Sequence, residues 1–117
     1  TVDIKLAISA YISDDYIQED RVRLELYRRL SKASEIQEVY AIEEEMEDRF
    51  GKPDVVTKQF IELIIIKILA LNLGIQNISS YEMNITFVSA DNTKETIKSP
   101  SRDDDDIIAT TLRYLRR

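Results

Sequence analysis

Two groups of carboxylates are the residues of this 117-residue chain whose types and spacing could do chemistry. The first is the run Asp103–Asp106, which offers the oxygen ligands that Ca²⁺ and Mg²⁺ prefer. The run lacks the D-x-D-x-D-G…E spacing of a calcium loop, and acids also stabilise the positive end of a helix dipole. We therefore expect the run to begin a helix, with a metal site as the alternative.

The second group is the stretch 35–50, which contains seven acidic residues and only one basic residue, Arg49. This excess accounts for the whole net charge of −6. Three consecutive acids, Glu43–Glu45, point about 100° apart on a helix and do not converge on one substrate. A solvated face is the expected role. A docking face for a basic partner is the alternative, because like charges at i,i+4 spacing are costly to keep.

The composition excludes most catalytic chemistry. The chain has no His and no Cys, so it cannot build a Ser-His-Asp triad, a cysteine nucleophile, a disulfide or a zinc site on those ligands. The only glycines, Gly51 and Gly74, do not belong to a phosphate-binding loop. We expect a domain that is not an enzyme, has no catalytic residue, cofactor or metal, and does not bind or hydrolyse ATP alone.

The charge pattern also bears on nucleic acid and membrane partners. A net charge of −6 argues against strong DNA binding by this chain alone. The helix around residues 20–31 has a basic face that could touch phosphate, but Glu25 lies within it, so a solvated, salt-bridged face is expected. The most apolar run, 60–73, is too short and too charged to span a bilayer. We expect a cytoplasmic protein without membrane contact.

The periodicity of apolar residues predicts the elements that position these groups. Helices are expected at about 20–31, 35–50, 53–73 and 103–114, and strands at 4–8, near 75–78, at 83–88 and at 95–98. The helix at 53–73 is apolar on nearly every side and should be buried. The pattern predicts one compact α+β domain: three helices with a buried central helix, a small, mostly antiparallel sheet and a closing C-terminal helix. Because the chain begins at Thr1, we expect a fragment of a longer protein.

Arg23 interrupts the apolar arc of the first helix, where it projects between Tyr27 and Leu30. An unpaired charge in such a place is very costly. We therefore predict that Arg23 is at least partly buried and forms a structural ion pair. The expected partner is a carboxylate from the second helix or from the turn at Asp14–Asp15.

Four segments resemble the C-terminal domain of the bacterial transcription-repair coupling factor family. In chain order they are AYISDDYI at 10–17, RVRLELYRRL at 21–30, EMEDRFG at 45–51 and LGI at 73–75. Their order and spacing match the family over residues 2 to 78. Ser13 stands where the family favours Pro.

The resemblance implies a function that composition does not. Residues 1–117 would be the non-catalytic C-terminal regulatory domain of an ATP-dependent DNA translocase that displaces stalled RNA polymerase and recruits UvrA. The domain would dock on a UvrB-like amino-terminal module and mask the UvrA-binding surface. The acids preceding R-F-G, Glu45 and Asp48, would face that module, and Glu38 extends their stripe. Two alternatives stay open: a nucleic-acid contact module acting through the first helix, or a purely structural domain.

Overall fold

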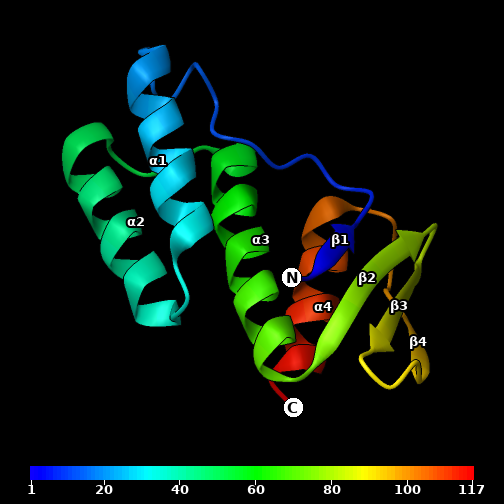
Figure 1. The fold of residues 1–117 in the computed structure, drawn as a ribbon. Coiled ribbons are helices and arrows are strands. Elements are labelled where there is room, and N and C mark those ends of the chain that lie inside the picture. Colours follow the sequence, from blue (N-terminus) through cyan, green and yellow to red (C-terminus); the bar gives the residue numbers. More distant parts are fainter. The chain divides into compact units, whose positions relative to one another are not determined.

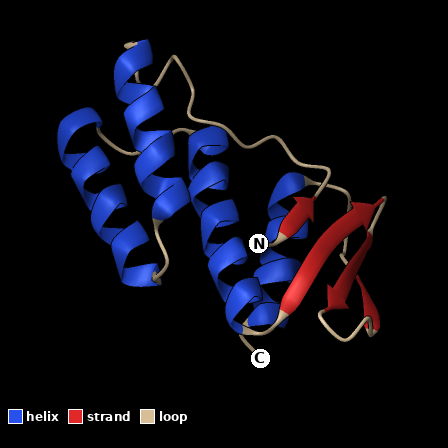
Figure 2. Ribbon diagram, in the orientation of Figure 1, coloured by secondary structure: helices blue, strands red, loops and turns tan.

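The computed structural model describes all residues 1–117. Along the chain the elements are β1 (Asp3–Lys5), α1 (Asp20–Lys32), α2 (Ile36–Phe50), α3 (Val55–Asn72), β2 (Ile75–Tyr81), β3 (Asn84–Ser89), β4 (Lys94–Lys98) and α4 (Asp104–Leu115) (Figure 1). The predicted α+β class is confirmed, with four helices and a small sheet (Figure 2). The chain forms two compact units, a helical unit of residues 9–65 and a mixed unit of residues 1–8 and 66–117.

The helical unit contains α1, α2 and the first part of α3. The antiparallel helices α1 and α2 are joined by a short loop (Figure 1). Their apolar stripes recur at the 3.6-residue period and face the core. The buried apolar residues of this unit are Ile12, Ile17, Leu26, Leu30, Val39, Ile42, Met46, Ile61, Ile64 and Ile65. The rings of Tyr27 and Phe60 meet edge to face at 5.0 Å and tie α1 to α3.

Local signals fix the ends of α2 and α3. At the start of α2, the Glu38 carboxylate accepts a hydrogen bond from the backbone N–H of Glu35 at 3.2 Å. The helix ends at Gly51, whose φ of 83° is strained for any residue with a Cβ. At the start of α3, the Asp54 carboxylate accepts from the N–H of Thr57 at 3.2 Å. Each of these contacts satisfies a backbone group that a helix end leaves without a partner.

The mixed unit is a four-stranded sheet in the order β1-β2-β3-β4, with α4 along one face (Figure 1). The strand β1 is parallel to β2, and the other two pairs are antiparallel. The core between the sheet and the helices consists of Ile66, Ala70, Ile75, Ile78, Ile85, Phe87, Ile107, Ile108 and Leu115. Residues of α3 thus appear in the cores of both units, which explains why this helix is apolar nearly all round.

The first strand is shorter than predicted. The sequence pattern extends it to residue 8, but β1 ends at Lys5. Beyond that point the N–H of Ala7 donates to the Ser80 hydroxyl at 2.8 Å, and the N–H of Ile8 donates to the carbonyl of Leu6 at 2.9 Å. These bonds replace the ladder and turn the chain away from β2.

None of the four helices has the length and apolar character that a membrane span requires.

Candidate docking surface on the helical unit

Three of the acids on α2 are held by partners within the chain. Glu38 caps the helix and also accepts a hydrogen bond from the Ser34 hydroxyl at 3.2 Å. The Glu43 carboxylate lies 2.6 Å from Lys58 Nζ of α3. The Glu45 carboxylate is bound in two places by the guanidinium of Arg29 of α1, at 2.6 and 3.1 Å. These acids stabilise the unit locally, so they contribute less free charge to the surface than their number implies.

The expectation that Glu43 lies on a solvated face is wrong. Its side chain is only 12% exposed. It follows the buried Val39 by four residues and precedes the buried Met46 by three, so it shares their face of α2. That spacing is visible in the sequence and could have placed Glu43 on the buried side of α2. The compensating cation, Lys58, comes from another helix and could not be read from α2 alone.

The Arg29–Glu45 contact is a two-pronged ion pair at the surface of the unit. The hydrogen bond from Arg29 holds the pKa of Glu45 below its usual value, and the same bond raises the pKa of Arg29. The two side chains remain 38% and 42% exposed, so water screens their attraction. The two parallel hydrogen bonds nevertheless orient the Glu45 carboxylate toward α1 and away from the outer side of α2.

The acids that remain available lie on a different strip of α2. Glu44, Glu47 and Asp48 are exposed and take part in no ion pair. Their i, i+3 and i+4 spacing places them on one side of the helix. Tyr40, one turn before Glu44, is 47% exposed on the same side. We call Tyr40, Glu44, Glu47 and Asp48 the acidic face.

Only one residue of the predicted docking stripe belongs to the acidic face. Asp48 is fully part of it, whereas Glu45 turns toward Arg29 and Glu38 caps the helix. The sequence missed Glu44 and Glu47. They were visible as acids, but their exposure depends on how α2 is rotated against its neighbours.

A shallow cavity of about 280 Å³ opens near the C-terminal end of α2. Its lining residues are Asp15, Tyr16, Ile17, Gln18, Glu19 and Phe50. The Tyr16 hydroxyl donates a hydrogen bond to the carbonyl of Gly51 at 2.6 Å. Burial, reinforced by the negative charges of Glu47, Asp54 and Glu43, raises the pKa of Tyr16 to about 12.

Arg23 is 18% exposed, and its expected partner is wrong. It pairs with Asp20 of its own helix rather than with α2 or the Asp14–Asp15 turn. It also donates to the carbonyls of Ile17 and Gln18, at 2.5 and 3.1 Å. Because Asp20 is 93% exposed, the two carbonyls form the less hydrated part of this contact. Arg23 thus fastens the loop before α1 to the helix.

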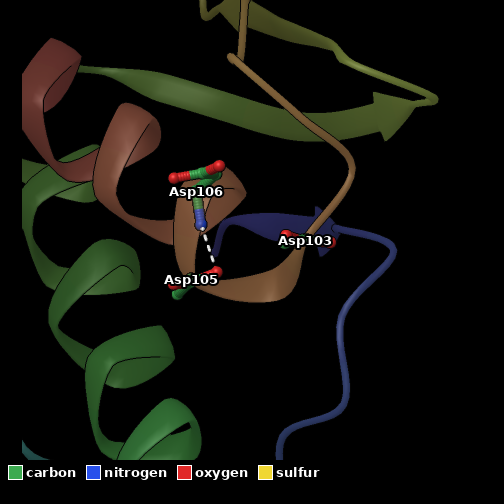
Figure 3. A group of neighbouring side chains, drawn as sticks. All are labelled: Asp103, Asp105 and Asp106. Atoms are coloured by element: carbon green, nitrogen blue, oxygen red, sulfur yellow. Dashed lines mark hydrogen bonds between the residues drawn. The ribbon is translucent and has the colours of Figure 1, made fainter.

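The aspartate run lies at the start of α4, as expected for acids at a helix N-terminus (Figure 3). The Ser101 hydroxyl donates to the Asp106 carboxylate at 2.7 Å and accepts from the N–H of Asp103 at 3.0 Å. Carboxylate oxygens of Asp103, Asp105 and Asp106 lie within 4.8 Å of one another, a grouping that acids at a helix start produce without an ion.

Residues 6–99 match the family model described as the TRCF domain. The chain belongs to this family. This TRCF domain is 47% identical over 115 residues to the transcription-repair-coupling factor of Helicobacter pylori strain J99, with 98% of the chain and 12% of that protein aligned. It is 31% identical over 103 residues to the protein of the same name from Rickettsia prowazekii, covering 86% of the chain and 9% of that protein. The chain thus spans about an eighth of the length of the H. pylori relative.

A solved structure shows the same fold. The crystal structure of the C-terminal domain of transcription-repair coupling factor superposes with a TM-score of 0.73 and covers 97% of this chain and 94% of that one. Their sequence identity is 16%, so this likeness shows the fold alone. Together with the family match, it confirms the resemblance seen in the four sequence segments.

Proposed function

We propose that this TRCF domain is the non-catalytic C-terminal regulatory module of its parent protein. In this proposal residues 1–117 dock on a UvrB-like amino-terminal module and mask the surface that UvrA binds. The parent is an ATP-dependent DNA translocase that acts on stalled RNA polymerase. Release of the domain then exposes the UvrA-binding surface, which couples polymerase engagement to DNA repair.

The observation that carries the proposal is the acidic face of α2. The helical unit contains 14 acidic and 8 basic residues, whereas the mixed unit contains 8 of each. The whole net charge of −6 therefore belongs to the helical unit. Glu44, Glu47 and Asp48 present part of this charge to solvent and form no ion pair within the chain. A basic surface on the docking module would be complementary to it and would be attracted over roughly a Debye length of 8–10 Å.

The contacts of α2 support a different set of docking residues for this proposal from the set suggested by the sequence. Asp48 is the strongest candidate because it is exposed and lies next to Glu44 and Glu47. Glu45 can contribute only by sharing its carboxylate with Arg29. Glu38 is occupied in capping α2, and we expect it to add little.

The alternative contact with nucleic acid through α1 has less support. The basic face of α1 includes Arg29, and this guanidinium is bound by Glu45. Glu25 is exposed among the remaining cations of the face. The local charge is therefore partly neutralised by residues of the same unit, so the docking role is the better supported function.

The test uses the parent protein carrying Glu44→Arg together with Asp48→Arg. UvrA capture should rise, and binding of the domain to the UvrB-like module should weaken by about 2–5 kcal/mol if the pairs are desolvated, or less at a wet rim. The wild-type interaction should also weaken as salt is added. Glu25→Arg, a single charge reversal at an exposed position of α1, is the control. Unchanged UvrA capture by a variant that melts like wild type would show that the acidic face is only solvated.

A further inference from the structure

The sheet of the mixed unit has one face that no helix of that unit covers. The C-terminal part of α3 and the helix α4 pack against the face that carries Ile78, Ile85 and Phe87. Because side chains alternate along a strand, the strand register gives the residues of the opposite face. They are Asp3 and Lys5 of β1, Asn77, Ser79 and Tyr81 of β2, Asn84, Thr86 and Val88 of β3, and Lys94, Thr96 and Lys98 of β4. We call this set the open sheet face.

The charge on the open sheet face is opposite to that of the chain as a whole. Three lysines stand on it against one carboxylate, Asp3, which lies 3.7 Å from Lys5. The strands β2, β3 and β4 contribute no acid to it. Lys94 and Lys98 are exposed and form no ion pair. Their attraction for an external anion is therefore not satisfied within the chain.

The uncharged residues of this face are hydrogen-bonding groups. Ser79, Thr86 and Thr96 lie opposite one another across three strands, and the two threonine hydroxyls are 3.0 Å apart. Tyr81, at the end of β2, is 75% exposed and pairs across the ladder with Asn84, which in turn faces Lys98. Lysine, hydroxyl and amide side chains are the usual donors to phosphate and sugar oxygens. An exposed aromatic ring is the platform on which an unpaired base stacks.

We propose that the open sheet face binds single-stranded nucleic acid. Lys94 and Lys98 are four residues apart on β4, or roughly 13 Å, so they contact different phosphates of one strand. Tyr81 stacks on a base at the edge near Lys98. A single strand fits better than a duplex, because the open sheet face has no helix or ribbon that enters a groove and the ring of Tyr81 requires an unpaired base.

An acidic protein surface is the other occupant that three lysines could attract. The acidic face of α2 on a second copy of the chain is an example with suitable charge. The exposed ring of Tyr81 and the row of hydroxyls favour the nucleic acid, because they match bases and phosphate oxygens as well as charge. Binding is expected to be weak, with a dissociation constant of about 10⁻⁶ to 10⁻⁴ M, as for sequence-independent contacts.

The experiment titrates the 117-residue chain into a fluorescein-labelled oligothymidylate of about 15 nucleotides at low salt, with anisotropy as the readout. We expect saturable binding, and the logarithm of the association constant should fall with the logarithm of the salt concentration with a slope of about −1.4, the value for two phosphate contacts on a single strand. Lys94→Glu with Lys98→Glu should weaken binding at least about tenfold. The matched control, Lys32→Glu with Lys52→Glu, makes the same charge change at exposed lysines of the helical unit and should change binding less than about twofold.

A second pair of variants tests the stacking ring. Tyr81→Ala should weaken binding by about fivefold or more, and Tyr81→Phe should retain it, since phenylalanine keeps the π-face. Absence of saturable binding by wild type, or an equal loss in the lysine control, would overturn the proposal. So would equal affinity for a duplex of the same length. Self-association that depends on Lys94 and Lys98, without oligonucleotide binding, would instead identify a second copy as the occupant.

Discussion

Arg29 of α1 and Glu45 of α2 are joined by two hydrogen bonds, from Nη1 to Oε2 at 2.6 Å and from Nη2 to Oε1 at 3.1 Å. They come from two helices adjacent in the chain and link them on the surface of the helical unit. The contact turns Glu45 toward α1, whereas Glu44, Glu47 and Asp48 are exposed on the outer side of α2.

The first prediction concerns the strength of this pair. A double-mutant cycle with Arg29→Ala and Glu45→Ala should give a coupling free energy of about 0.2–1 kcal/mol, because both side chains are partly exposed and screened. The pKa of Glu45 is lowered in the folded state, so this stabilisation is present above its ordinary value of 4.5 and is lost as the pH falls through the lower folded value. Urea denaturation at neutral and acidic pH measures both effects. A coupling that is zero at pH 7 would contradict this prediction.

The same pair affects how docking must be tested. Glu45→Arg would place a second guanidinium against Arg29, so reversal at this position should destabilise the fold by about 0.5–1 kcal/mol. Glu44→Arg, one residue earlier and exposed, should stay within about 0.5 kcal/mol of wild type. Equal unfolding free energies for the two variants would show that the Arg29–Glu45 contact contributes nothing in solution.

Arg23 should stabilise the protein through backbone carbonyls more than through its ion pair. Arg23→Leu leaves the carbonyls of Ile17 and Gln18 without this donor and should lower the free energy of unfolding by about 1–3 kcal/mol. Asp20→Asn keeps the side-chain shape and should cost no more than about 1 kcal/mol, because Asp20 is exposed. Thermal or urea unfolding of the two variants measures the difference. A larger loss for Asp20→Asn would assign the stabilisation to the ion pair.

Lys58 should stabilise the folded state, because it compensates the charge of the poorly hydrated Glu43 carboxylate. Lys58→Met leaves Glu43 without its cation and should destabilise by about 1–3 kcal/mol. Burial opposes the charge on Lys58, but the hydrogen bond and charge of Glu43 outweigh it and raise the Lys58 pKa. This contribution is therefore present below the ordinary value of 10.5 and is lost as the pH rises through the higher folded value. If Glu43→Gln with Lys58→Met is no more stable than Lys58→Met alone, the stranded charge is not the cause.

Tyr16 should ionise only at strongly alkaline pH. Its folded pKa is about 12, raised first by burial and then by nearby carboxylates, whereas the unfolded value is near 10. The group therefore stabilises the fold up to about pH 10 and loses this effect as the pH rises toward 12. Ultraviolet titration of phenolate formation in wild type and in Tyr16→Phe isolates this residue by difference. A difference spectrum that titrates near pH 10 in the folded protein would contradict the burial of this hydroxyl.

The sequence by itself determined most of the local structure. Apolar periodicity located the four helices to within about two residues, because helix faces follow directly from residue spacing. Gly51 marked the end of α2, since its φ of 83° suits glycine. The all-round apolar character of α3 predicted its burial. The run at Asp103–Asp106 marked the start of α4, because acids there face the positive end of the helix dipole.

Only the tertiary structure decided what the individual charges do. Glu43, Glu44 and Glu45 are consecutive acids, yet one is buried against Lys58, one is exposed and one is bound to Arg29. Their fates depend on how α2 is rotated against the neighbouring helices, whose partner residues lie 15 and 16 positions away in the chain. The open sheet face likewise exists only through the register that aligns four strands. Local sequence fixes which residues share a side of an element, whereas packing between distant elements determines which side meets solvent, a cation or a core.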